Sequence, residues 1–181
     1  MTTDVWKQYD GHAVTHSMGH YLMAVRDLLK ARGYARVTDV ASFLEVSRSS
    51  ASTFLHSLRK KGFLDEDENH FLRLSPRGEE IALQIVRNQL ILESFFRNIL
   101  GVEEEQALVD ACKMEHLLSP ETSYRLLALI QILQTDPELR AKAIEGVARQ
   151  ACPQTDDCPI CADSPSCLME RTVESLKKNP L

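Results

Sequence analysis

Apolar residues recur every three or four positions along most of the chain, and this spacing predicts a mainly helical protein. In the first such stretch, Val14, Met18, Leu22 and Val25 share one helical face, and Gly33 is placed to end that helix. The predicted helices cover residues 13–32, 38–44, 48–61, 76–100, 103–117, 120–135 and 137–150, with a short one at 167–178. The exception is 63–74, where two short apolar runs flank an acidic turn and predict a β-hairpin.

Helix, short turn, helix and hairpin follow one another in the order of a winged helix-turn-helix domain, in which the third helix enters the major groove of DNA. We therefore predict a winged helix-turn-helix domain over residues 1–76 and an all-helical domain over 77–150. A short Cys-rich tail over 151–181 should follow, because its composition shifts to Pro, Asp and Cys.

The predicted recognition helix is basic and rich in hydroxyl groups. Residues 47–64 include no acidic residue, and small hydroxyls near a helix start can bond phosphates and base edges. The candidate DNA contacts are Ser47, Arg48, Ser49, Ser50, Ser52, Thr53, Arg59 and Lys60. The alternative is a winged helix used for protein contacts, and the acidic turn at 65–68 argues against phosphate contact at the tip of the wing.

The net charge of the chain and its expected location in the cell limit the classes of function that it could have. The chain of 181 residues has 21 basic against 26 acidic side chains, which argues against a generally basic nucleic-acid coat but not against a local basic patch. No apolar run approaches the roughly 18 residues that a membrane span needs. The start, MTTDVWKQYDG, lacks the layout of a secretory signal. We expect a cytoplasmic protein without a membrane partner, whose cysteines are metal or redox candidates before they are disulfides.

Cys112, Glu115 and His116 have the spacing of one helical face. A thiolate, a carboxylate and an imidazole suit a borderline divalent ion such as Zn²⁺, Fe²⁺, Co²⁺ or Ni²⁺, although helices also carry such residues without a metal. A tetrahedral site would need a further ligand from another segment. A metalloenzyme using Glu115 as a base is disfavoured, because phosphate-loop, nucleophile-elbow and His-Glu-x-x-His motifs are missing. We expect no enzyme activity.

Four of the five cysteines fall within the tail in the pattern Cys-x5-Cys-x2-Cys-x5-Cys, at Cys152, Cys158, Cys161 and Cys167. Their proximity lets four thiolates converge on one centre at small entropic cost. An iron–sulfur cluster is favoured over structural Zn²⁺, because the x5 spacers are looser than those of zinc ribbons. Disulfides or free thiols are the third alternative. A cluster there would make the chain an iron–sulfur redox or iron sensor, which is the alternative function.

Several motifs occur in the order seen in one family of regulators. His20-Tyr21-Leu22 lies in the first helix, and GYARVTDVASFLEVSRSSAS spans the helix-turn-helix. LSPRG follows the wing, Arg87-Asn88-Gln89-Leu90 lies in the long helix, and Ala111-Cys112-Lys113-Met114-Glu115-His116 comes later. Over roughly residues 16–135, the chain resembles the iron-dependent repressor family, the DtxR-type and MntR-type metal-responsive regulators. The tail is not part of that pattern.

The resemblance implies a primary metal site made by His20, Cys112, Glu115 and His116. The family has Met or Asp where this chain has His20, which shifts preference away from Mn²⁺. The expected cofactor is a divalent transition metal, with Fe²⁺ favoured over Zn²⁺, Mn²⁺ or Co²⁺. The family's second site is depleted here, with Gln89 and Glu93 left, and Glu93 is a candidate for bonding a metal ligand. His12 and His16 are candidates for extra ligands, but the favoured expectation is that they are ordinary polar positions.

The resemblance also implies partners and a mechanism. Members dimerise through the helices after the wing, so a homodimer should bind palindromic double-stranded DNA. A metal ion would tie the first helix to the dimerisation domain and fix the spacing of the two recognition helices. The function implied is that of a transcription regulator, by family habit a repressor, of metal-homeostasis genes.

Overall fold

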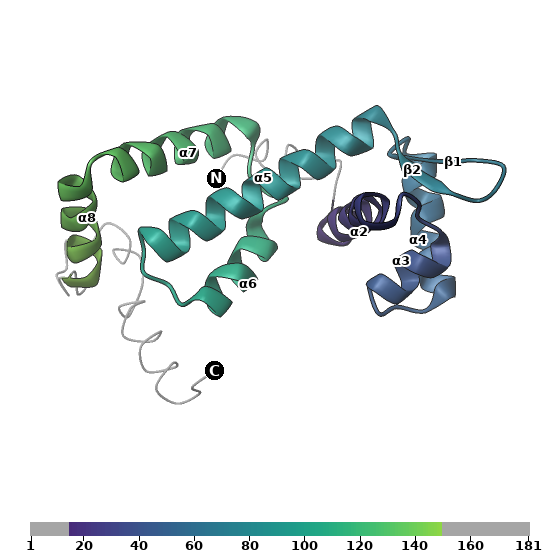
Figure 1. Cartoon of the computed structure of the whole chain (residues 1–181), viewed down its shortest axis with the longest axis horizontal. Helices are drawn as coiled ribbons and strands as arrows, with labels where there is room; N and C mark the ends of the chain where they lie inside the picture. Colours follow the sequence, from purple (N-terminus) through teal and green to yellow (C-terminus); the bar gives the residue numbers. More distant parts are fainter. Residues whose placement is uncertain (1–14, 150–181) are drawn as a thin grey trace, which may run out of the picture. The chain divides into compact units, whose positions relative to one another are not determined.

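The computed structural model describes residues 15–149. Along that part of the chain come α2 (His16–Arg32), α3 (Val37–Phe43), α4 (Arg48–Lys60), β1 (Leu64–Glu66), β2 (Leu72–Leu74), α5 (Pro76–Asn98), α6 (Glu104–Met114), α7 (Pro120–Thr135) and α8 (Pro137–Arg149) (Figure 1). Its contacts divide the chain into two units, Met1–Thr135 and Asp136–Leu181. The four tail cysteines, His12 and the helix predicted for 167–178 lie outside the described residues.

The mainly helical fold with a two-stranded wing is confirmed. The strands pair antiparallel, with Leu64 opposite Leu74 and Glu66 opposite Leu72. One helix differs from its predicted bounds in a way that matters for the metal ligands, because α6 ends at Met114 and Glu115 is its C-cap residue. Among the described residues, no helix is both long and apolar enough to cross a membrane.

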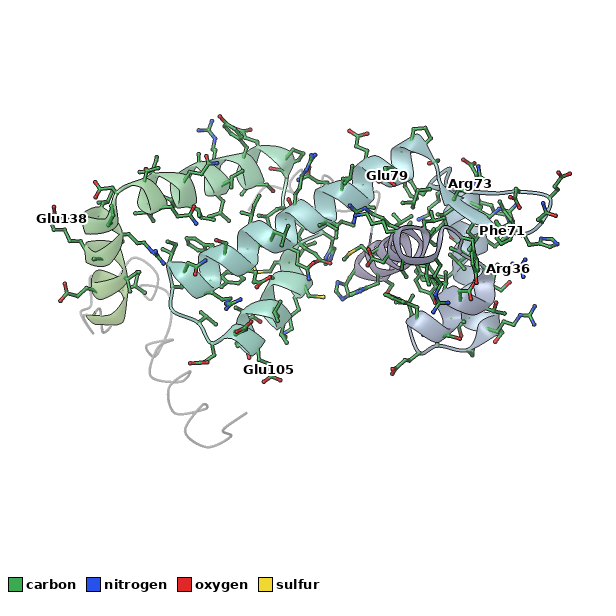
Figure 2. The ribbon with its side chains drawn as sticks, in the orientation of Figure 1. Arg36, Phe71, Arg73, Glu79, Glu105 and Glu138 are labelled. Atoms are coloured by element: carbon green, nitrogen blue, oxygen red, sulfur yellow. The ribbon has the colours of Figure 1, made fainter. Side chains whose placement is uncertain are left out.

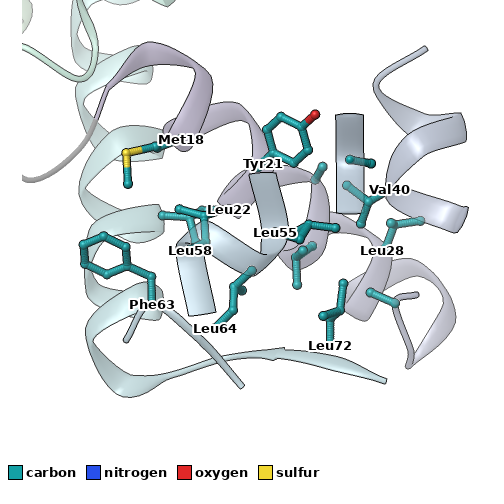
Figure 3. Close-up of a cluster of buried hydrophobic side chains, with 14 of the residues drawn as sticks. Met18, Tyr21, Leu22, Leu28, Val40, Leu55, Leu58, Phe63, Leu64 and Leu72 are labelled. Atoms are coloured by element: carbon teal, nitrogen blue, oxygen red, sulfur yellow. The ribbon is translucent and has the colours of Figure 1, made fainter. Parts of the chain in front are cut away.

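Helix α2 belongs to the core of the winged helix and also packs on the long helix α5. Leu22 on its apolar face is fully enclosed in a cluster with Leu55 and Leu58 of α4 and with Leu64 and Leu72 of the strands (Figure 3). Val25 belongs to the same buried cluster. Thr15 caps the start of α2, and Gly33 ends it with a positive φ of 78°. Any movement of α2 is therefore transmitted to the recognition helix with which it shares a core.

The passage from the wing into α5 is held by capping and by a close backbone approach. The Ser75 hydroxyl accepts from the Gly78 N–H at 3.0 Å and donates to the Gly62 carbonyl at 2.7 Å. Pro76 occupies the first turn of α5, where its missing N–H costs nothing. A Cβ at Gly78 would lie 2.0 Å from the carbonyl oxygen of Phe63, so the LSPRG segment needs glycine there for packing.

Gly78→Ala should destabilise the protein by about 1–3 kcal/mol or more, because the new methyl group collides with backbone that cannot rotate away. Gly146→Ala is the matched control. A Cβ at Gly146 in α8 meets no atom within 4 Å, and alanine is the better helix former by about 0.5–1 kcal/mol. Urea unfolding followed by circular dichroism measures both. Equal stability of the two variants would contradict the close packing of α5 on Phe63.

Candidate metal centre

Four metal-ligating side chains converge where α2 passes the end of α6. His16 and His20 lie one turn apart on α2, while Cys112 lies in the last turn of α6 and Glu115 caps it. Their nearest ligand atoms all lie within 4.8 Å of one another. Two helices far apart in the sequence therefore supply one compact donor set.

The distances within this group suit a single small cation. The Cys112 Sγ lies 3.5 Å from the His20 Nε2, and the His16 and His20 Nε2 atoms are 3.0 Å apart. Nitrogen and sulfur ligands held tetrahedrally at the usual zinc distances would be separated by roughly 3.3–3.6 Å. These two distances are thus close to the spacing that coordination requires, and the whole donor set lies within 4.8 Å.

Glu115 completes the group with a buried carboxyl group. The residue is 1% exposed, and its Oε2 has no hydrogen-bond partner among residues 15–149. Burial raises the pKa of Glu115 to about 7. A buried carboxylate without a donor is costly, and a bound cation would satisfy it.

Burial also favours the uncharged forms of His20 and Cys112. Burial, and next the neighbouring His16, lowers the pKa of His20. Burial, and next the charge of Glu115, raises the pKa of the Cys112 thiol. A divalent ion reverses this balance, because it stabilises the thiolate and the carboxylate and releases their protons on binding. The residues present therefore fit a transition-metal ion in both geometry and charge.

The structure changes the expected roles of two histidines. The expectation that His16 is an ordinary polar position is wrong, because α2 directs its Nε2 to the Nε2 of His20. The signal was available in the sequence, since His16 and His20 have the i, i+4 spacing that made Cys112 and His116 candidates. His116 follows the end of α6 and is not one of the four grouped donors. Its ring centroid lies 5.0 Å from that of His16, so its role as a ligand stays a prediction.

Glu93, one of the two residues left of the family's second metal site, makes an ion pair. Glu93 accepts a hydrogen bond from Arg97 at 3.0 Å, and Arg97 also pairs with Glu104 at 3.1 Å. Glu93 is not in the donor group found among the described residues. It takes part in an ion-pair chain between α5 and α6, and a second metal site at Gln89 and Glu93 stays a prediction.

All eight candidate DNA contacts lie on the exposed side of α4 or at its start. On the opposite side, Ala51, Leu55 and Leu58 are buried in the winged-helix core. Ser47 has a second task, since its hydroxyl accepts from the Ser50 N–H at 3.1 Å and caps the helix. The buried apolar side of α4 thus fixes the helix on the core, and the polar residues at its start face the solvent.

The wing orients basic side chains beside this face. Glu66 of β1 pairs with Arg59 of α4 and also bonds the His70 ring. The guanidinium of Arg36, the residue that precedes α3, lies 4.5 Å from the ring centroid of Phe71 (Figure 2). Glu66 therefore positions Arg59, which belongs to the predicted DNA-binding surface.

Glu115→Gln should flatten the pH dependence of stability when a chelator removes metal. With its pKa raised from 4.5 to about 7 in the folded state, Glu115 retains a proton on folding that the unfolded chain has lost. Its stabilising contribution is full below about pH 4.5 and is lost as the pH rises through about 7. From this group, the free energy of unfolding should fall by up to about 3 kcal/mol. Urea unfolding at several pH values measures it, and parallel pH profiles for the two proteins would contradict the burial argument.

Two family profiles match the chain in sequence. One is the iron dependent repressor N-terminal DNA binding domain, at residues 13–70, and the other is the iron dependent repressor metal binding and dimerisation domain, at 75–142. The chain is 34% identical over 128 residues to the HTH-type transcriptional regulator MntR of Lysinibacillus sphaericus (strain C3-41), covering 71% of this chain and 91% of that protein. It is 34% identical over 136 residues to MntR of Geobacillus thermodenitrificans (strain NG80-2), covering 75% and 95%.

Solved structures share the fold. IdeR of T. acidophilum matches with a TM-score of 0.54 at 24% identity, over 65% of this chain and 55% of that one. The metal-dependent transcriptional regulator MtsR matches with a TM-score of 0.57 at 19% identity, over 65% and 54%. The chain thus spans about half the length of these two proteins. The family matches and the MntR relatives agree with the donor group and the winged helix: the chain belongs to the iron-dependent repressor family and is a metal-dependent, DNA-binding transcriptional regulator, not an enzyme.

Proposed function

We propose that the chain is a homodimeric repressor of metal-homeostasis genes, switched on by one divalent ion held between α2 and α6. The observation that carries this proposal is the 3.5 Å approach of the Cys112 thiol to the His20 imidazole across 92 positions of sequence. When bound, the ion would bond both helices at once. The protein would act in the compartment that holds its operator DNA.

The coupling to DNA runs through α2. This helix shares the winged-helix core with α4, so a bond from α2 to α6 restricts where the recognition helix lies relative to the helices behind the wing. In a two-fold dimer, that restriction sets the separation of two recognition helices against successive major grooves of a palindromic operator. A coupling free energy of about 3 kcal/mol would tighten operator binding by roughly a hundredfold.

Fe²⁺ is the proposed ion. The donor chemistry disfavours Mn²⁺ but does not place Fe²⁺ above Co²⁺ and Zn²⁺, which bind such ligands more tightly, so availability in the cell has to select Fe²⁺. Two imidazoles and a thiolate are softer ligands than the oxygen donors that Mn²⁺ prefers. Because Cys112 and Glu115 must lose protons, the affinity for any of these ions should rise with pH. The physiological ion is the one for which affinity matches its free concentration in the cell.

Mutating the proposed ligands should separate this site from the tail cysteines. In the full chain with Cys152, Cys158, Cys161 and Cys167 changed to Ser, we expect metal-dependent DNA binding to persist. In that background, His20→Ala and Cys112→Ser should each lower Co²⁺ affinity by at least about tenfold and abolish the metal response, because each removes one donor. Competition with a chelator measures affinity, and fluorescence anisotropy with DNA selected by the metal-loaded protein measures the response.

His56→Ala, an exposed histidine of α4, is the matched control for Co²⁺ affinity and should leave it unchanged. The competing function is an iron–sulfur sensor that signals through the tail. If the four tail substitutions alone remove the metal response, while His20→Ala and Cys112→Ser made in the chain with its tail cysteines intact leave the response in place, that function replaces the one proposed.

Arg48→Ala should weaken operator binding at least about tenfold and lower the slope of log affinity against log salt by about 1, because an exposed guanidinium at the start of α4 is placed for phosphate or base contact. Lys30→Ala removes an exposed positive charge from the last turn of α2 and should change little. Anisotropy titrations over a range of salt concentrations distinguish the two. Equal losses would place the DNA surface elsewhere.

A further inference from the structure

One fully buried amide lies behind the metal donors, in the middle of α5. Asn88 is 1% exposed. Its Nδ2 donates to the carbonyl oxygen of Glu115 at 2.5 Å and to that of Leu118 at 3.3 Å. Its Oδ1 accepts from the Gln84 Nε2 at 2.7 Å and from the Ser123 hydroxyl at 2.6 Å. Both donors and both acceptor positions of the amide are used.

These hydrogen bonds satisfy a backbone carbonyl group at the end of α6. A helix leaves its last carbonyls without intrahelical partners, and burying such groups unpaired is costly. Because α6 ends at Met114 with Glu115 as its C-cap residue, the Glu115 carbonyl lies where the next turn would have supplied a donor. Asn88 supplies that donor from a neighbouring helix, so a side chain of α5 caps α6, and its second N–H binds the Leu118 carbonyl in the connection to α7.

The capped residue is itself one of the grouped metal donors. Glu115 presents its carboxyl group to the donor set and its carbonyl to Asn88, so the amide fixes the backbone from which the carboxyl group projects. Cys112 precedes it by one turn of the same helix. Metal ligands need to be held within about 0.5 Å of their productive positions. Groups that orient ligands in this way typically account for about 10–100-fold in metal affinity.

The same amide reaches α7. The Ser123 hydroxyl, buried in the first turns of α7, donates to Asn88 Oδ1 at 2.6 Å and has the Ser119 carbonyl as a second, longer acceptor at 3.0 Å. A single side chain therefore joins the metal-bearing end of α6 to the start of the next helix. If either the end of α6 or the start of α7 shifted, Asn88 would lose its hydrogen bonds to one of these two segments.

We propose that Asn88 is a positioning residue for the metal site, which holds the Glu115 end of α6 in ligating geometry and ties it to α7 through Ser123. This inference rests on the proposed metal site. Asn88 touches no metal and acts only through the carbonyls that it binds.

The test uses Co²⁺ as both ligand and probe, in the full chain with the four tail cysteines changed to Ser. Asn88→Leu keeps a side chain of similar size but removes all four hydrogen bonds. We expect Co²⁺ affinity to fall about 10–100-fold. The thiolate-to-Co²⁺ charge-transfer and ligand-field bands should also shift or weaken, because the geometry at Glu115 and Cys112 is relaxed.

Two controls separate positioning from general stability. Leu92→Ala removes a buried apolar side chain of the same helix, so it should lower the melting temperature and keep the wild-type Co²⁺ spectrum. Asn98→Leu alters an exposed amide of α5 that bonds only Ser94 among the described residues, and it should change neither. If Asn88→Leu retains the wild-type affinity and spectrum, or if Leu92→Ala alters them as much, the proposal is overturned.

Ser123→Ala keeps the test decisive if Asn88→Leu does not fold. It removes only the hydroxyl that orients Oδ1, and we expect a several-fold loss of Co²⁺ affinity with a smaller spectral change. Unchanged affinity and spectrum in Ser123→Ala would contradict the link to α7. Failure of the proposed function looks different, because the parent protein would then show no Co²⁺ band that depends on Cys112, and the inference would fail with it.

Discussion

The approach of α2 to the end of α6 is the contact on which the rest depends. On one side of α2, Leu22 and Val25 lie in the core that supports the recognition helix. On its other side, His16 and His20 meet Cys112 and Glu115. Because one rigid helix serves both purposes, an ion that holds α2 against α6 acts on the DNA-reading helix without touching DNA.

The metal donors and the residue behind them share one physical problem, which is the cost of burying polar groups. Asn88 solves it with four hydrogen bonds. Glu115 Oε2 is left without a partner among the described residues, and this selective deficit is what a cation can relieve. Because the buried amide is satisfied and the buried carboxyl oxygen of Glu115 is not, the energy of this site should change sharply when an ion binds.

Most of the fold followed from local patterns, because helical periodicity, capping residues such as Ser75 and the acidic turn between β1 and β2 act over a few residues. The end of α6 did not follow from its local pattern. The spacing of its residues permits a helix to 117, yet the helix ends at Met114. The carbonyl of the next residue, Glu115, binds Asn88, which lies 27 positions earlier in the sequence. Likewise Glu66 is acidic in sequence, and only the packing of β1 on α4 pairs it with Arg59.

The sequence by itself determined the winged helix and the order of its helices. Residue type and spacing gave two of the four grouped donors, Cys112 and Glu115, and the family resemblance added His20. Tertiary structure decided that His16 belongs with His20, that His116 lies beside this group, and that Glu93 pairs with Arg97. The reason is that a donor set depends on distances between helices, whereas periodicity states only which face of a single helix a residue occupies.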